Sequence, residues 1–188
     1  MSKTKKITVS AIMVALSIVL TLVSKVIPAP WLQGGSITIA SAVPIILVSL
    51  ILGWKWGLIS SVAFSIIQMM TGFYSPPTQT FIYFVLVILF DYVLAFGVYG
   101  LAGIFYPLFK KRPWAIPLSG CIVMVLRFVC HIISGVLIWG VYAEEGQSVW
   151  QYSLLYNGTY MVPEIIITTI VLALLIPFVR SMEKQYGR

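Results

Sequence analysis

The chain has 188 residues, of which 60% are hydrophobic and only 9% are charged, and its mean hydropathy is +1.02. This composition provides too few polar residues to coat a soluble globule, so lipid must cover most of the surface. Because a membrane-spanning helix needs about 20 residues, the length allows about six spans and no additional soluble domain.

Apolar runs follow one another along the whole chain, bounded by charged residues, proline and glycine. Their lengths predict an all-α integral membrane protein with about six transmembrane helices, which form one domain over residues 1–188. Short connections separate these runs. The expected spans cover about residues 7–27, 36–53, 56–74, 79–109, 114–142 and 152–179.

The basic residues predict the orientation of these spans. If the spans alternate from an inside amino terminus, most of the 12 Lys and Arg residues fall on one side, and the acidic pair Glu144 and Glu145 falls on the other. The positive-inside rule then places both termini in the cytoplasm, with the protein crossing the cell membrane several times. The net charge of +7 reflects this topology rather than a nucleic-acid partner, since the charges are dispersed among loops. The residues on the inner side are Lys3, Lys5, Lys6, Lys55, Lys110, Lys111, Arg112, Arg180, Lys184 and Arg188.

Ionisable side chains inside the spans are rare, and such residues mark a site or an internal ion pair. A rise of ~1.5 Å per residue places Asp91, His131 and Glu164 about 18, 16 and 18 Å below the outer surface. These three side chains can therefore share one layer near the middle of the membrane. Arg127 lies one turn deeper than His131, so it can instead pair with Glu164 or Asp91, and that carboxylate would then be structural.

The fifth span carries a candidate ligand face above this layer. His131, Gly135 and Trp139 recur at i, i+4 and i+8, so the glycine leaves a gap between an imidazole and an indole. A flat ligand can lie in this gap. The alternative interpretation is a helix-packing glycine beside an interfacial tryptophan.

The last span carries a second polar face. Asn157, Tyr160 and Glu164 share one side of the helix, and Tyr152 lies at its outer end. Polar groups avoid lipid, so this face points inward, either to a ligand or to other helices. The segment from Trp31 to Ser36 can close over the outer mouth as a lid, or its tryptophan can serve as a membrane anchor.

These groups together suit an aromatic cation. A carboxylate balances the charge, indole and phenol faces attract the cation, and His, Asn and Tyr can bond to ring nitrogens and a hydroxyl. The chain contains no phosphate-binding loop, no metal-ligand spacing and no run of paired carboxylates. We therefore expect no cofactor and no metal, and concentrative uptake would require a partner that hydrolyses nucleotide.

Three segments carry a resemblance to a known family. Residues 91–97 (DYVLAFG), 127–136 (RFVCHIISGV) and 152–164 (YSLLYNGTYMVPE) are similar to the ThiT (YuaJ) family, the thiamine-binding S components of energy-coupling-factor transporters. The resemblance extends from the first span to the last. It implies a six-helix S-component bundle that binds thiamine with high affinity between the outer parts of its last three spans, and that is not an enzyme.

The resemblance also implies a set of ligand residues. The family usually has glutamate where this chain has Asp91, so the carboxylate is one methylene shorter here. Arg127, Tyr160 and Glu164 would contact the ligand residues rather than the ligand itself. The residues that match the ligand positions of the family are Trp31, Asp91, Tyr92, His131, Gly135, Trp139, Tyr152 and Asn157.

The family assembles with a membrane-embedded T subunit and two ATPase subunits, and the resemblance implies the same partners here. Ala11 and Ala15 in the first span correspond to the small-residue motif that contacts the T subunit. Alanines four residues apart leave a flat stripe that another helix can approach closely. The alternative is ordinary packing within the bundle.

Two other functions remain open at this point. The ligand can be another flat vitamin or a thiamine precursor, because proteins with one scaffold differ in the chemistry of their pockets. Asp91, His131 and Glu164 can also form the acid–base group of a small intramembrane enzyme. Neither a nucleophile paired with a base nor a metal-ligand spacing accompanies them.

Overall fold

The computed structural model describes residues 1–26 and 35–186, and within these ranges the chain is helical, without a β-strand. The prediction of an all-α protein is confirmed. The first half contains α1 (Lys3–Ser24), α2 (Val43–Leu52), α3 (Trp54–Gly72) and a continuous rod made of α4 (Phe81–Val87), η1 (Ile88–Leu94), α5 (Ala95–Gly97), η2 (Val98–Leu101) and α6 (Ala102–Leu108). The second half contains α7 (Ala115–Ser134), η3 (Gly135–Trp139), η4 (Gly140–Tyr142), α8 (Val149–Leu174) and α9 (Ile176–Tyr186).

Within the described ranges, 4 helical segments are long and apolar enough to cross a membrane: Lys3–Ser24, Phe81–Leu108, Ala115–Tyr142 and Val149–Leu174. The other two predicted spans differ from these. α3 has 19 residues, but Lys55, three serines and Gln68 make it less apolar. The run predicted at 36–53 is helical only over the 10 residues of α2. The described residues thus form a helical membrane protein, and the count of six crossings stays a prediction.

α2 is short because it forms the centre of the protein instead of facing lipid. Every one of its residues is buried, and the helix packs against α1, α3 and α6. A helix that is apolar on all sides is typical of such a core position. Pro44 in its first turn provides a fixed φ where no backbone donor is needed, and Gly53, at φ 99°, makes the sharp turn into α3.

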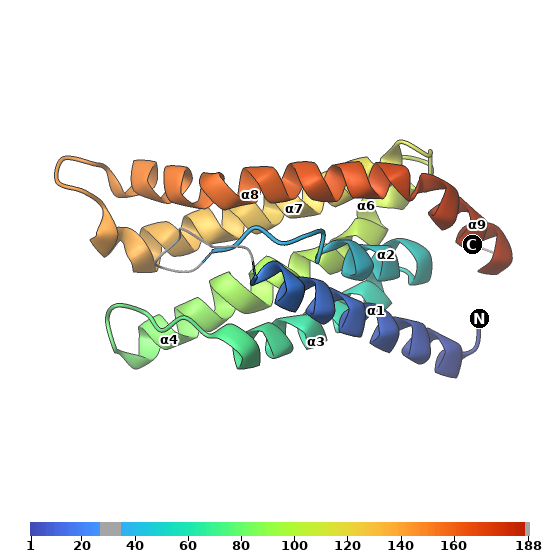
Figure 1. Ribbon diagram of the computed structural model, residues 1–188, viewed down its shortest axis with the longest axis horizontal. Helices are drawn as coiled ribbons and strands as arrows, with labels where there is room; N and C mark the ends of the chain where they lie inside the picture. Colours follow the sequence, from blue (N-terminus) through green and yellow to red (C-terminus); the bar gives the residue numbers. More distant parts are fainter. Residues whose placement is uncertain (27–34, 187–188) are drawn as a thin grey trace.

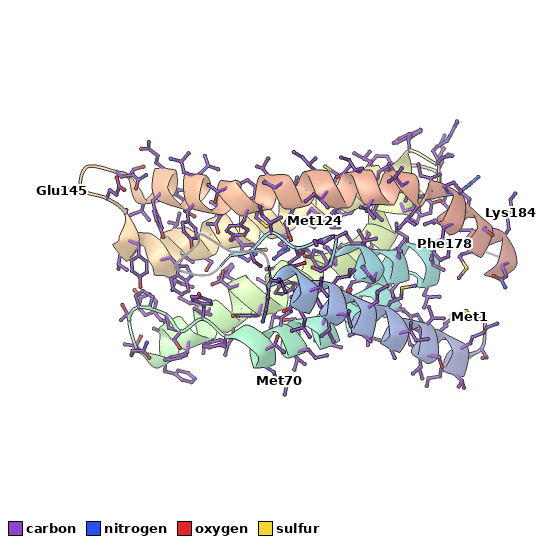
Figure 2. The ribbon with its side chains drawn as sticks, in the orientation of Figure 1. Met1, Met70, Met124, Glu145, Phe178 and Lys184 are labelled. Carbon is purple, nitrogen blue, oxygen red and sulfur yellow. The ribbon has the colours of Figure 1, made fainter. Side chains whose placement is uncertain are left out.

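The helices form an elongated bundle in which α7 and α8 lie side by side over most of their length (Figure 1). Both termini lie at one end of this bundle (Figure 1). Glu145, in the loop before α8, lies at the other end, far from Lys184 (Figure 2). Met124 of α7 lies inside the bundle and is fully buried, whereas Met70 of α3 points away from it (Figure 2).

Residues 35–42 run between the two halves of the bundle before α2 begins. The Ile39 N–H donates to Ser24 Oγ of α1 at 2.8 Å, and the Thr38 N–H donates to Glu164 Oε1 of α8 at 2.6 Å. This non-helical segment therefore contacts both α1 and α8, and these contacts anchor its backbone donors inside the protein.

Candidate ligand-binding site

A cavity of about 300 Å³ is lined by residues of α1, α3, η1, α7, η3 and α8. This volume lies at the lower end of the range of about 300–1,000 Å³ that small-molecule sites occupy. Each predicted ligand residue within the described ranges lines the cavity, whereas Trp31 lies outside those ranges. The lining residues among them are Asp91, Tyr92, His131, Gly135, Trp139, Tyr152 and Asn157.

Two π-helical segments build the acidic side of the cavity. Asp91 and Tyr92 lie in η1, and Trp139 ends η3. A π-helical turn contains an extra residue, so it changes the direction of the side chains that follow, and such turns occur often at functional sites. The two segments meet where Trp139 Nε1 donates to Asp91 Oδ2 at 3.1 Å.

Three donors from one helical rod hold the Asp91 carboxylate. Oδ2 accepts from Ser134 Oγ at 2.7 Å as well as from the Trp139 indole, and Oδ1 lies 3.3 Å from His131 Nδ1. A carboxylate has about four acceptor positions, so one remains for a ligand donor. The carboxylate therefore has a fixed direction and still faces the cavity with part of its surface.

The protonation of His131 follows from its second contact. Arg127 Nε donates to His131 Nε2 at 3.2 Å. A guanidinium can only donate, so Nε2 carries no proton and the imidazole is neutral. Its single ring proton is then on Nδ1, from which it donates to Asp91. Arg127 thus selects the histidine tautomer that supports the carboxylate.

Arg127 also forms a buried ion pair with Glu164. One guanidinium nitrogen, Nη1, lies 2.7 Å from Glu164 Oε2 and 2.7 Å from the Tyr99 hydroxyl. The guanidinium carbon lies 4.8 Å from the centre of the Phe96 ring, which adds a cation–π contact. Of the two structural pairings that the sequence allowed for Arg127, the structure contains the one with Glu164.

Gly135 and Asn157 connect α8 to the α7–η3 rod. A Cβ atom at Gly135 would lie 2.1 Å from Ser153 Oγ, so only glycine fits at this crossing. Asn157 Nδ2 donates to the Ser153 and His131 carbonyls at 2.9 and 3.2 Å, while its Oδ1 accepts from the Tyr160 hydroxyl. Gly135 therefore packs two helices together, as the alternative interpretation expected. Gly135 and Asn157 also line the cavity.

Aromatic rings form much of the remaining wall. The Tyr92 hydroxyl donates to the Gly72 carbonyl at 2.9 Å and accepts from the Tyr74 N–H at 3.0 Å, which fixes its ring. Tyr152 stacks on Tyr156, with ring centres 5.7 Å apart. Among the described residues, the buried Tyr152 hydroxyl has no hydrogen-bond partner.

α1 and α3 provide a wall of the cavity that was not predicted from the sequence. Thr21, Lys25 and Gln68 line the cavity, and Gln68 Nε2 donates to Thr21 Oγ1 at 3.0 Å. An amide inside an apolar run was the signal for Gln68, because a polar side chain in a span faces inward. Ser134 was not predicted either, although it lies one helical turn after His131 and shares its face.

The first helix has two different faces. Ala11 and Ala15 are exposed, whereas Met13 and Val14 between them pack against the core. The predicted small-residue stripe is therefore open on the outside of α1 within the described part of the chain, which argues against the alternative of internal packing.

These observations define a class: a helical membrane protein with a ligand cavity inside its bundle, in which neutral donors hold a partly buried carboxylate, Asp91. Comparison of this chain with known proteins identifies its family. The profile described as "Thiamine transporter protein (Thia_YuaJ)" matches residues 7–184. The chain therefore belongs to the thiamine transporter protein family, as the resemblance predicted.

Individual relatives agree with this assignment. The thiamine transporter ThiT of Bacillus subtilis is 37% identical over 177 residues, which are 88% of this chain and 86% of that protein. The thiamine transporter ThiT of Lacticaseibacillus paracasei is 30% identical over 95 residues, 46% of this chain and 47% of that protein. These relatives are named as transporters, so the role of the family is transport rather than catalysis.

A solved structure supports the fold. The structure of ThiT from Listeria monocytogenes superimposes with a TM-score of 0.73 at 20% identity, and the match covers 96% of this chain and 97% of that one. At this level of identity, the likeness concerns the fold alone.

Proposed function

We propose that this chain is the thiamine-binding S component of an energy-coupling-factor importer, which captures thiamine outside the cell and delivers it through an ATP-driven module. The observation that carries the proposal is the Asp91 carboxylate, which faces an aromatic-lined cavity and is held by neutral donors in a member of a thiamine transporter family. A bound cation can therefore supply its counter-charge.

The chemistry of thiamine fits the cavity. Thiamine joins a cationic thiazolium ring to an aminopyrimidine and carries a hydroxyl group. The thiazolium matches Asp91 and the π faces of Trp139 and Tyr92, because a cation is attracted both to a carboxylate and to an aromatic face. The Tyr152 hydroxyl and Gln68 amide provide polar partners for the pyrimidine and hydroxyl groups.

The proposed topology has six crossings with both termini in the cytoplasm. In this arrangement, residues 36–52 form one crossing although only α2 within them is helical, and α3 forms the next. Non-helical backbone is tolerated at membrane depth where protein groups satisfy its donors, as Glu164 and Ser24 do for the N–H groups of Thr38 and Ile39. An even number of crossings agrees with the position of both termini at one end of the bundle (Figure 1). The cavity then opens toward the outside of the cell membrane.

The proposed partners are a membrane-embedded T subunit and two ATPase subunits. The chain has no phosphate-binding loop, so the energy for uptake must come from another protein. The exposed stripe of Ala11 and Ala15 on α1 is the proposed contact with the T subunit. Small side chains allow the close backbone approach that drives helix association in lipid.

A titration tests the proposal. Purified protein is titrated with thiamine and with a panel of other flat vitamins and thiamine fragments, and binding is followed by calorimetry and by quenching of tryptophan fluorescence. We expect saturable binding of one thiamine per chain and weaker binding of the others. Tighter binding of a different vitamin, or no binding of thiamine, would overturn the proposal. The mass of any small molecule that copurifies provides an independent check.

A further inference from the structure

The buried charges around the cavity have an uneven balance. Asp91 and Glu164 each carry one negative charge, Arg127 carries one positive charge, and His131 is neutral because its Nε2 accepts from Arg127. This cluster therefore retains a single negative charge. Lys25 also lines the cavity, but it is exposed and donates to the Thr71 carbonyl, so water screens its charge.

Glu164 is placed to neutralise Arg127 and is shut off from the cavity. Its side chain is 2% exposed, and it is not among the residues that line the cavity. Oε2 accepts from Arg127, and Oε1 accepts from both the Thr38 N–H and the Thr38 hydroxyl. Arg127, in contrast, does line the cavity.

We propose that Glu164 is a positioning residue for ligand charge: by neutralising Arg127, it keeps the cavity selective for organic monocations over neutral molecules of the same shape, without contacting the ligand. This inference rests on the proposed function. Without the Glu164 charge, the guanidinium beside His131 would cancel the field of Asp91 at the ligand. The cavity would then have no net charge and would bind a neutral ring as well as a cationic one.

The expected size of the effect follows from Coulomb's law. One unit charge several ångströms from a ligand charge, at an effective dielectric constant of about 20, changes affinity by roughly tenfold to a hundredfold. A neutral ligand lacks this interaction. The ratio of the two affinities therefore reports the charge of the cavity, whereas general damage to the fold lowers both affinities together.

The experiment compares thiamine with its thiophene analogue, in which an uncharged ring of the same shape replaces the thiazolium. Both ligands are titrated into the parent protein and into Glu164→Gln. We expect the variant to lose roughly tenfold or more of its preference for thiamine, with the affinity for the analogue nearly unchanged. Equal losses for both ligands, or an unchanged preference, would overturn the inference.

Rescue by a second substitution separates charge from structure. Arg127→Gln combined with Glu164→Gln removes one charge of each sign, and the glutamine amide can still donate to His131. We expect the double variant to recover most of the preference for thiamine. A preference as low as that of Glu164→Gln alone would contradict the charge role, because a purely structural defect should not improve when a second buried group is removed.

Two matched variants complete the test. Glu164→Asp keeps the charge but changes the reach, and Thr38→Val removes the hydroxyl donor to Glu164 but keeps every charge. We expect both to keep the preference for thiamine, even where their affinity or stability falls. If either lost the preference as Glu164→Gln does, geometry rather than charge would be responsible. A parent protein that ignores thiamine would instead contradict the proposed function, which makes the two failures distinguishable.

Discussion

Asp91 and Glu164 are both carboxylates in the interior of the bundle, but their surroundings differ. Asp91 lies in a π-helical turn, accepts from neutral donors and faces the cavity. Glu164 lies in the regular helix α8, pairs with Arg127 and bonds to the segment before α2. The comparison shows that the partner of an interior charge decides its role. A carboxylate with neutral partners can still attract a ligand cation, whereas a carboxylate in an ion pair is already neutralised within the fold.

The largest effect on stability is expected at the Glu164 region. Arg127→Ala leaves the Glu164 carboxylate buried without its counter-charge, which lowers the free energy of unfolding by about 3–5 kcal/mol. Asp91→Asn is the comparison variant, because it removes the other carboxylate and leaves the Arg127–Glu164 ion pair intact. Thermal unfolding in detergent should show a large decrease for the first and a small one for the second. Similar decreases would abolish the distinction between the two carboxylates.

The next largest effect is on ligand binding. Here a substitution at Asp91 should have a larger effect than one in the Glu164 region. Asp91→Asn should weaken thiamine binding by roughly tenfold to a hundredfold, because it removes the charge opposite the thiazolium ring. Asp91→Glu keeps the charge and matches the residue usual in the family, so it should retain most of the affinity. Calorimetric titration measures both. If Asp91→Asn bound thiamine as the parent does, the carboxylate would have only a structural role.

A smaller effect is expected at Trp139, which connects the Asp91 region to the aromatic wall. Trp139→Phe removes the indole donor to Asp91 but keeps an aromatic face, so part of the affinity should remain. Most of the quenching of tryptophan fluorescence by thiamine should disappear. Quenching as strong as in the parent would assign the signal to another tryptophan, with Trp31 as the next candidate.

The smallest effect on the cavity is expected from α1. Ala11→Trp with Ala15→Trp places bulky side chains on an exposed face that does not line the cavity, so thiamine affinity should be nearly unchanged. ATP-dependent uptake by vesicles with the coupling module should nevertheless be lost, because the indoles keep the T subunit from close approach. Full uptake would show that the stripe is not the docking surface. Weaker thiamine binding would show that α1 and the cavity are coupled.

Much of the site could be predicted from the sequence. Helical spacing shows which residues share a face or a depth, and the few charged residues inside the spans mark the site. The rise per residue placed Asp91, His131 and Glu164 at similar depth, and Asp91 and Glu164 are indeed joined through His131 and Arg127. The roles of the two acids were not predictable, since depth does not reveal which acid faces the arginine. The departure from α-helical periodicity in η1 and η3 also has no signal in residue spacing.

The fold was harder to predict where an apolar run is buried in protein instead of facing lipid. An apolar run at 36–53 has the composition of a spanning helix, and hydropathy does not distinguish lipid from a protein core as its surroundings. Thr38 and Ser41, which bond to each other and lie next to Glu164, keep the start of this run out of a helix. Glu164, the partner of Thr38, lies 126 residues away in the sequence, so local patterns contain no record of the contact.

The structure of the protein with thiamine bound tests the central comparison most directly. We predict that the thiazolium ring lies within about 4–6 Å of the Asp91 carboxylate, the distance at which opposite charges interact strongly, while Glu164 keeps its ion pair with Arg127. A thiazolium ring beside Glu164 with Arg127 displaced, or thiamine bound outside this cavity, would contradict the account.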